Sequence, residues 1–114
     1  MDLKDVISNM PNYEQLDKLT NLFKVLGDMT RAKILYTLEK KELCVSDICE
    51  CILMNKSAVS HQLKVLKDAH LVKCRKLGKE VYYSIDDDHV ALIFKCALEH
   101  VNEGKWGIDY EKDI

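Results

Sequence analysis

The sequence predicts a mainly α-helical domain that carries one β-hairpin. Apolar residues recur at helical spacing along most of the 114 residues, and short runs of β-forming residues replace that spacing only between residues 71 and 85. The chain is 47% apolar but holds only 4 glycines and 1 proline, too few turn-forming residues for a large β-sandwich. We therefore expect one domain with its own hydrophobic core.

Four amphipathic helices are expected before the hairpin, each preceded by a polar residue suited to an N-cap. Gly27 is the expected end of the first of them. The expected helices are 13–26 with N-cap Asn12, 29–40 with N-cap Asp28, about 47–53 with N-cap Ser46, and about 56–69 with N-cap Asn55.

The hairpin is predicted from two strands, 71–76 and 80–85, around Leu77-Gly78-Lys79. A last helix over 87–103 begins with negative charge that complements the helix dipole, and Gly104 ends it. Two helices joined by a short connection and followed by a basic hairpin are typical of a winged helix-turn-helix. The expected organisation is an N-terminal extension (1–12), for which a helix and an irregular segment both stay open, the winged-helix domain (13–104) and a tail (105–114).

The formal charge of −2 hides an uneven distribution. The segment 56–80 holds seven basic and two acidic residues, whereas the other 89 residues hold ten basic and seventeen acidic ones. A basic block in an acidic chain indicates a localised surface for anions such as DNA phosphates. Solvent-facing residues of the second helix of the motif and the hairpin tip are the candidate DNA contacts: Lys56, Ser57, Ser60, His61, Lys64, Arg75, Lys76 and Lys79.

The last helix carries a candidate metal site, formed by Asp87, His89, His100 and Glu103. Eleven residues bring His100 within about 20° of the face of His89, but about 16 Å further along the axis. Because zinc ligands lie about 2.0–2.2 Å from the ion, one helix cannot bring both pairs to one metal. Two antiparallel copies can, so the spacing predicts a homodimer through its terminal helices, with two sites suited to Zn(II) or Co(II) and no organic cofactor. The apolar residues around the helix suit such an interface.

The chain has no long apolar stretch and no apolar core of a signal peptide in its first residues. A cytoplasmic protein with no membrane segment is therefore expected. Five cysteines are an odd number, which favours free thiols or metal ligands over a disulfide framework.

With these motifs the sequence resembles the ArsR/SmtB family of metal-responsive winged-helix repressors, from about residue 13 to residue 103. Four stretches carry the resemblance: FKVLGDMTRAKILYTL (23–38), ELCVSDI (42–48), SAVSHQLKVLKDAHLV (57–72) and D-x-H-x10-H-x2-E (87–103). It implies a homodimer that represses metal-handling genes and leaves its double-stranded operator DNA when metal binds. It also implies that Ser57, Ser60 and His61 are recognition-helix residues and that His100 reaches toward His70.

Other functions stay open at this point. A soft-metal or arsenite sensor would use Cys44, Cys49 and Cys51, although Ser46 stands where thiol-type relatives have a cysteine, and Cys49 and Cys51 project about 200° apart on a helix. A repressor that responds to thiol oxidation would use the same cysteines. A zinc hydrolase is disfavoured because four protein ligands leave no open position for water. We therefore expect a regulator and not an enzyme.

Overall fold

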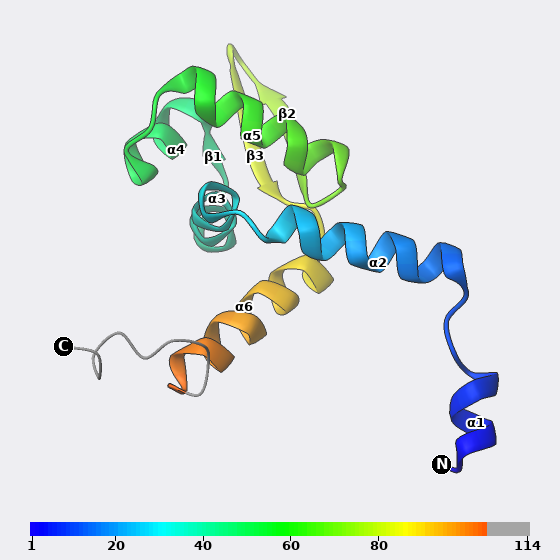
Figure 1. The fold of residues 1–114 in the computed structure, drawn as a ribbon. Coiled ribbons are helices and arrows are strands. Elements are labelled where there is room, and N and C mark those ends of the chain that lie inside the picture. Colours follow the sequence, from blue (N-terminus) through cyan, green and yellow to red (C-terminus); the bar gives the residue numbers. More distant parts are fainter. Residues whose placement is uncertain (105–114) are drawn as a thin grey trace.

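The computed structural model describes residues 1–104, so the predicted tail (105–114) lies outside the described residues. Within them the chain forms helices and one antiparallel sheet (Figure 1). In chain order the elements are α1 (Leu3–Ser8), α2 (Tyr13–Leu26), α3 (Met29–Lys40), β1 (Leu43–Cys44), α4 (Val45–Ile52), α5 (Lys56–Asp68), β2 (Val72–Leu77), β3 (Glu80–Ile85) and α6 (Asp88–Asn102).

Three of the four predicted N-caps are confirmed by side-chain hydrogen bonds. The Asn12 carboxamide accepts from the Gln15 N–H at 2.8 Å, and the Gln15 side chain accepts in return from the Asn12 N–H at 3.0 Å. The carboxylate of Asp28 accepts from the Arg31 N–H at 3.0 Å, and Asn55 accepts from the Ala58 N–H at 2.8 Å. Each cap satisfies a donor that the first helical turn cannot pair by itself.

The prediction that Ser46 caps the short third helix of the series is wrong. The N-cap of α4 is Cys44, whose side chain makes no capping hydrogen bond, and Ser46 lies exposed in the first turn. The reason is β1: Leu43 pairs with Tyr83 and Cys44 with Tyr82, which keeps the backbone extended through Cys44 and lets the helix begin at Val45. Sheet pairing therefore sets this helix start.

The predicted hairpin is confirmed, with β2 and β3 paired antiparallel from Val72 opposite Ile85 to Leu77 opposite Glu80. Gly78 lies in the tight turn at a φ of +64°, a conformation that glycine adopts without steric cost. The unexpected strand is β1, which adds to the other edge of β3 and gives the order β1-β3-β2.

The core lies between α3, α4, α5 and the start of β2. Its fully buried side chains follow the predicted helical faces. The core residues are Ile34, Leu35, Leu38, Leu43, Ile48, Ile52, Val59, Leu63, Leu66, Leu71 and Val72.

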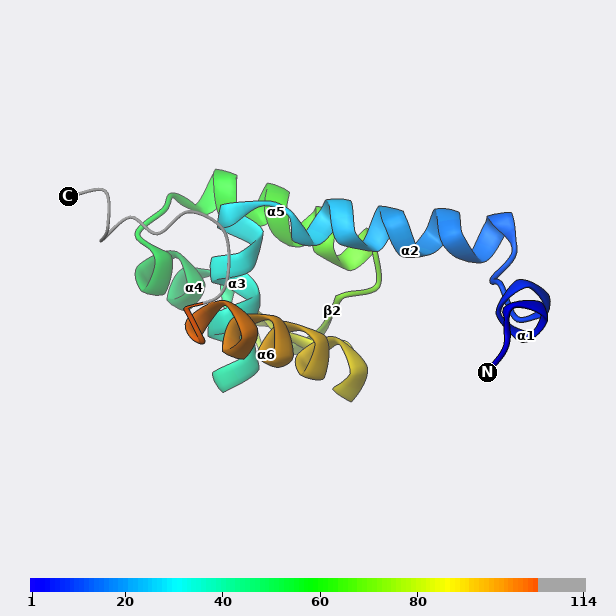
Figure 2. The same ribbon diagram turned by 60° about the horizontal axis from the view of Figure 1, so that its bottom comes forward.

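Helices α1, α2 and α6 lie outside this core and contain no buried residue (Figures 1 and 2). One side of α6 packs Val90 and Phe94 against the core, while Leu92, Ile93 and Val101 are exposed. On α2, Leu16, Leu19 and Phe23 are exposed as well. Contiguous exposed apolar stripes of this kind mark an interaction surface.

Candidate DNA interface and metal site

Helix α5 separates its core side from its solvent side cleanly. Val59, Leu63 and Leu66 have no exposed surface. The predicted DNA contacts on this helix all lie on the opposite, exposed side: Lys56, Ser57, Ser60, His61 and Lys64. The preceding turn brings α4 against α5 through Leu53, whose left-handed φ of 56° lets the Met54 N–H donate to the Cys49 carbonyl at 3.2 Å. The two helices thus form a helix-turn-helix with a polar outer face.

The hairpin carries exposed basic side chains near its tip, but one basic side chain of the hairpin forms an ion pair within the chain. Lys76 and Lys79 are exposed beside the Gly78 turn. Arg75 instead makes a bidentate ion pair with Glu42, with Nη2 to Oε1 at 2.6 Å and Nε to Oε2 at 3.0 Å. This pair ties β2 to the segment before β1, so the Arg75 guanidinium has a protein partner that competes with a phosphate.

The Arg75 pair lowers the pKa of Glu42, chiefly by hydrogen bonding to its carboxylate, with a Coulombic contribution from Lys73. A folded-state pKa below the unfolded value adds stability that is present above about pH 4.3 and is lost as the pH falls through the folded-state pKa. We expect Glu42→Gln to remove this part of the acid destabilisation, measured as the unfolding midpoint against pH from 6 to 3. Arg75→Met should likewise reduce the change of the unfolding midpoint between pH 6 and pH 3. If the midpoint of both variants depends on pH as steeply as that of the parent protein, the pair does not contribute to acid stability.

One further link, which the sequence did not predict, positions α5. The Arg31 side chain donates from Nε to the Val25 carbonyl at 2.7 Å and from Nη1 to Oε1 of Gln62 at 3.3 Å, which joins the end of α2 to α5. The sequence contains a signal for this contact. Arg31 lies three, four and seven residues before buried positions of α3, and this spacing places it on the same face of the helix as those positions. At the other end of α5, the nearby side chain of Cys74 on β2 raises the pKa of Lys67.

The predicted metal ligands lie at the two ends of α6. Asp87 is the N-cap, with Oδ1 accepting from the Val90 N–H at 3.0 Å, and His89 Nδ1 lies 3.8 Å from the same oxygen. His100 is in the last turn, and its carbonyl accepts from the N–H of Glu103, the C-cap, at 3.2 Å. Within residues 1–104 of one chain, no three His, Cys, Asp or Glu side chains gather as a metal site. The two predicted pairs therefore lie apart in one copy, as the spacing requires.

The remaining predicted site residues are three cysteines and His70. Cys44 is buried, Cys49 half-buried and Cys51 exposed, so the three thiols differ in their surroundings. His70 is exposed after α5 at a φ of 59°, and its N–H donates to the Lys67 carbonyl at 3.0 Å. One residue later, the Leu71 carbonyl accepts from the Asp86 N–H at 3.0 Å, which connects the segment after α5 to the segment before α6.

Comparison with known proteins identifies this architecture. The profile of the family described as "Bacterial regulatory protein, arsR family" matches residues 28–73. The "Transcriptional repressor SmtB homolog" of Synechocystis sp. is 34% identical over 101 residues, which cover 89% of this chain and 76% of that protein. The chain belongs to the ArsR/SmtB family of transcriptional regulators.

This ArsR/SmtB regulator has further close relatives. The "Cadmium resistance transcriptional regulatory protein CadC homolog" of Staphylococcus aureus is 43% identical, covering 75% of this chain and 71% of that one. The solution structure of a homodimeric winged helix-turn-helix DNA-binding domain from Mycobacterium bovis has a TM-score of 0.77 and 28% identity, over 84% of this chain and 91% of that one. The predicted winged helix-turn-helix is therefore confirmed, and the relatives are DNA-binding regulators and not enzymes. No helix within residues 1–104 is long and apolar enough to cross a membrane.

Proposed function

We propose that this ArsR/SmtB regulator is a homodimeric repressor that leaves its operator when Zn(II), or Co(II), binds between the two α6 helices. The observation that carries the proposal is the placement of one His/carboxylate pair at each end of an exposed helix. Antiparallel crossing of two such helices would join Asp87 and His89 of one protomer to His100 and Glu103 of its partner. The exposed apolar residues of α6 and α2 supply the surface for this dimer.

The donor set fits the metal. Two imidazoles and two carboxylates suit Zn(II) and Co(II) better than soft, thiophilic ions. At Asp87, capping occupies Oδ1 and leaves Oδ2 as the oxygen to face an ion, while the His89 side chain is 91% exposed. When bound, the ion would supply a positively charged cross-link between two helices that each present carboxylates.

Backbone hydrogen bonds within the chain link the start of α6 to α5, the proposed recognition helix. Asp86, next to the ligand Asp87, donates its N–H to Leu71, and Leu71 donates its own N–H to the Leu66 carbonyl of α5 at 2.9 Å. His70 lies within this connection, and we expect the side chain of the ligand His100 to reach toward it. Zinc then weakens DNA binding to the extent that it prefers a dimer in which the spacing of the two α5 helices does not match the operator.

A binding titration tests the function. An operator is selected from a random pool of DNA duplexes, and its affinity for the full chain is measured by fluorescence anisotropy without metal, with Zn(II), and with Mg(II) as a control. We expect Zn(II) to weaken binding by about 5–150-fold, the usual range of allosteric coupling, and Mg(II) to have no such effect. An unchanged or increased affinity in Zn(II) would contradict the proposal.

The wing should contribute phosphate contacts without reading sequence. Replacing both Lys76 and Lys79 by alanine is expected to weaken binding to all duplexes alike and to lower the slope of log K against log salt by about 1.8, or about 0.9 per lost phosphate contact. Lys18→Ala together with Lys33→Ala, two exposed lysines on other elements, is the matched control. Loss of affinity for the selected operator alone would show instead that the wing reads bases.

A second candidate is a soft-metal sensor that uses Cys44, Cys49 and Cys51, which the cadmium-resistance name of one relative favours. Because these thiols form no three-donor group within residues 1–104, they would need ligands from elsewhere. If Cys44→Ser abolished the response to metal while His89→Ala preserved it, this second candidate would replace the first. Mass spectrometry before and after peroxide would separate it from a thiol redox switch.

A further inference from the structure

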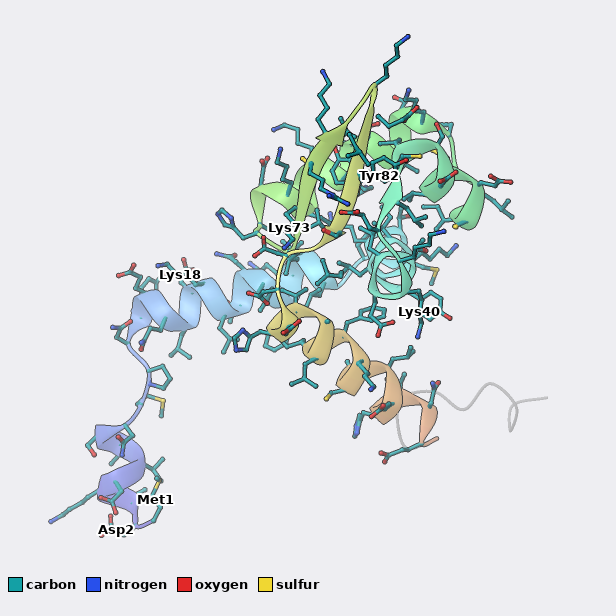
Figure 3. The ribbon with its side chains drawn as sticks, turned by 180° about the vertical axis from the view of Figure 1, so that it is seen from behind. Met1, Asp2, Lys18, Lys40, Lys73 and Tyr82 are labelled. Atoms are coloured by element: carbon teal, nitrogen blue, oxygen red, sulfur yellow. The ribbon has the colours of Figure 1, made fainter. Side chains whose placement is uncertain are left out.

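The apolar contacts of the hairpin β2–β3, the wing of the motif, are concentrated at its base. Val72 of β2 is 2% exposed, and Ile85 opposite it packs against the core. Toward the tip, Leu77 is 54% and Val81 37% exposed. The tip nevertheless projects beyond the helices around it (Figures 1 and 3). Contacts other than burial therefore set the direction of the outer half of the wing.

A bidentate ion pair links the middle of β2 to the segment before β1. Nη2 of Arg75 donates to Oε1 of Glu42 at 2.6 Å, and Nε donates to Oε2 at 3.0 Å. Strands β1 and β2 pair with opposite edges of β3, so they lie about 10 Å apart at the usual strand spacing. The ion pair therefore reaches across β3, where Tyr82 is paired with Arg75 on one side and Cys44 on the other. Tyr82 lies farther toward the tip of the hairpin than Lys73 (Figure 3).

The Glu42 end of the ion pair belongs to the part of the chain that enters the helix-turn-helix. Glu42 lies between α3, which ends at Lys40, and β1, whose Cys44 is the N-cap of α4. Arg75, by contrast, lies three residues before Gly78 of the hairpin turn. The ion pair thus connects the wing to the start of the helix-turn-helix across the face of the sheet.

Strand alternation separates Arg75 from the neighbouring lysine of the wing. Successive side chains of a strand point to opposite faces of the sheet. Val72 is buried and Cys74 half-buried, so this face of β2 is the core side, and Lys76 continues it toward the tip. Arg75 shares the opposite face with Lys73 and is held there by its carboxylate partner. The lysines of the tip are therefore better placed for phosphates than Arg75 is.

We propose that Glu42 is a positioning residue for DNA binding: its ion pair with Arg75 fixes the direction of the wing, so that Lys76 and Lys79 reach the DNA backbone. The inference rests on the proposed DNA interface and does not depend on the metal site. A loose wing has to be ordered when it binds, and this ordering costs affinity. The charge of Glu42 has the opposite effect, because removing a negative charge favours binding to a polyanion. The sign of the measured change therefore distinguishes the two effects.

Binding to a duplex of random sequence, measured by fluorescence anisotropy over a series of salt concentrations, tests the role of Glu42. We expect Glu42→Gln to weaken binding about two- to fivefold, the range that the energy of a partly exposed ion pair allows. It should also lower the slope of log K against log salt, because fewer phosphates are contacted. Stronger binding or a steeper slope would show instead that Glu42 withholds Arg75 from phosphate, and would overturn the proposal.

The matched control is Glu80→Gln, which removes the same charge from an exposed position of the same hairpin. It should not weaken binding, because Glu80 lies outside the ion pair with Arg75. Weakening of the same size in both variants would contradict a role of the ion pair.

A combined variant distinguishes positioning from a direct effect. If Glu42 acts through the wing lysines, Glu42→Gln should cause no further loss once Lys76 and Lys79 are both alanine. A loss that adds fully to that of the lysine variant would mean that Glu42 acts elsewhere. If only Glu42→Gln binds like the parent protein, this inference fails and the proposed interface stands. If the lysine variant also binds like the parent protein, the wing assignment fails as well.

Hydrogen exchange of the metal-free protein gives a measurement that does not involve DNA. Glu42→Gln should speed the exchange of the backbone amides from Arg75 to Tyr82, because the outer half of the wing loses its link to the rest of the chain. The amides of α5 around the buried Leu63 should keep their exchange rates, since the core does not include the ion pair. Unchanged exchange in the wing, or equal acceleration in α5, would contradict the proposal.

Discussion

Replacing His100 with alanine is expected to abolish the effect of zinc on operator binding while leaving the affinity of the metal-free protein unchanged. The side chain lies in the last turn of α6, away from the exposed face of α5 that would meet DNA. Without it each proposed inter-subunit site would lose one of its two imidazoles, and the coupling between zinc and DNA, typically about 1–3 kcal/mol, should vanish. Anisotropy titrations with and without Zn(II) measure this directly.

The matched control for His100→Ala is Glu99→Ala, one residue earlier and also exposed. It should keep the zinc response, because its position is off the stripe shared by the two half-sites. A His100→Ala protein that releases DNA in zinc as fully as its parent would show that the site is misassigned.

Replacing Leu63 with alanine is expected to have the largest effect on stability. Its side chain is fully buried on the core side of α5. Removing it costs the transfer free energy of the lost methyl groups and leaves a cavity, together about 2–5 kcal/mol. Because single domains are stable by only about 5–15 kcal/mol, a large share of the folded protein should be lost on warming, and DNA binding with it.

Chemical denaturation at one fixed protein concentration measures the Leu63→Ala effect, since dimerisation makes stability depend on concentration. Lys64→Ala is the neighbouring control. Its exposed ion pair with Asp68 at 3.1 Å should contribute about 0–1 kcal/mol. A Leu63→Ala cost no larger than that of Lys64→Ala would contradict the assignment of this core.

The elements that sequence predicts well here are those set by local chemistry. Asn12, Asp28 and Asn55 each cap the helix they precede, and Gly78 provides the turn of the hairpin. The helical faces that become the core follow from spacing alone, as at Val59, Leu63 and Leu66. These features depend on residues within one or two turns of each other.

The features that sequence missed depend on contacts between distant residues. Strand β1 has only two residues, and it exists because β3 offers an edge to Leu43 and Cys44; the misplaced start of α4 follows from that pairing. The Arg75–Glu42 pair spans 33 residues, so Arg75, a predicted DNA contact, also has a partner within its own chain. Neither can be derived from local propensity.

The candidate metal site likewise has features that local sequence predicts and features that depend on distant contacts. The helix and the positions of Asp87, His89, His100 and Glu103 along it follow from period and spacing. The same spacing predicts two half-sites in one chain, and within residues 1–104 of one protomer no three candidate ligands gather. The assembled site depends on a two-fold axis between chains, which stays a prediction.

Subunit complementation tests the central claim most directly. One variant carries Asp87→Ala and His89→Ala, and the other carries His100→Ala and Glu103→Ala; each homodimer should have no complete site. A mixed dimer restores one complete site from the intact halves of the two chains. We therefore predict one tightly bound Zn(II) per purified mixed dimer, against two for the parent dimer and none for either variant alone. Full zinc binding by either homodimer, or none by the mixed dimer, would contradict a site shared between the two α6 helices.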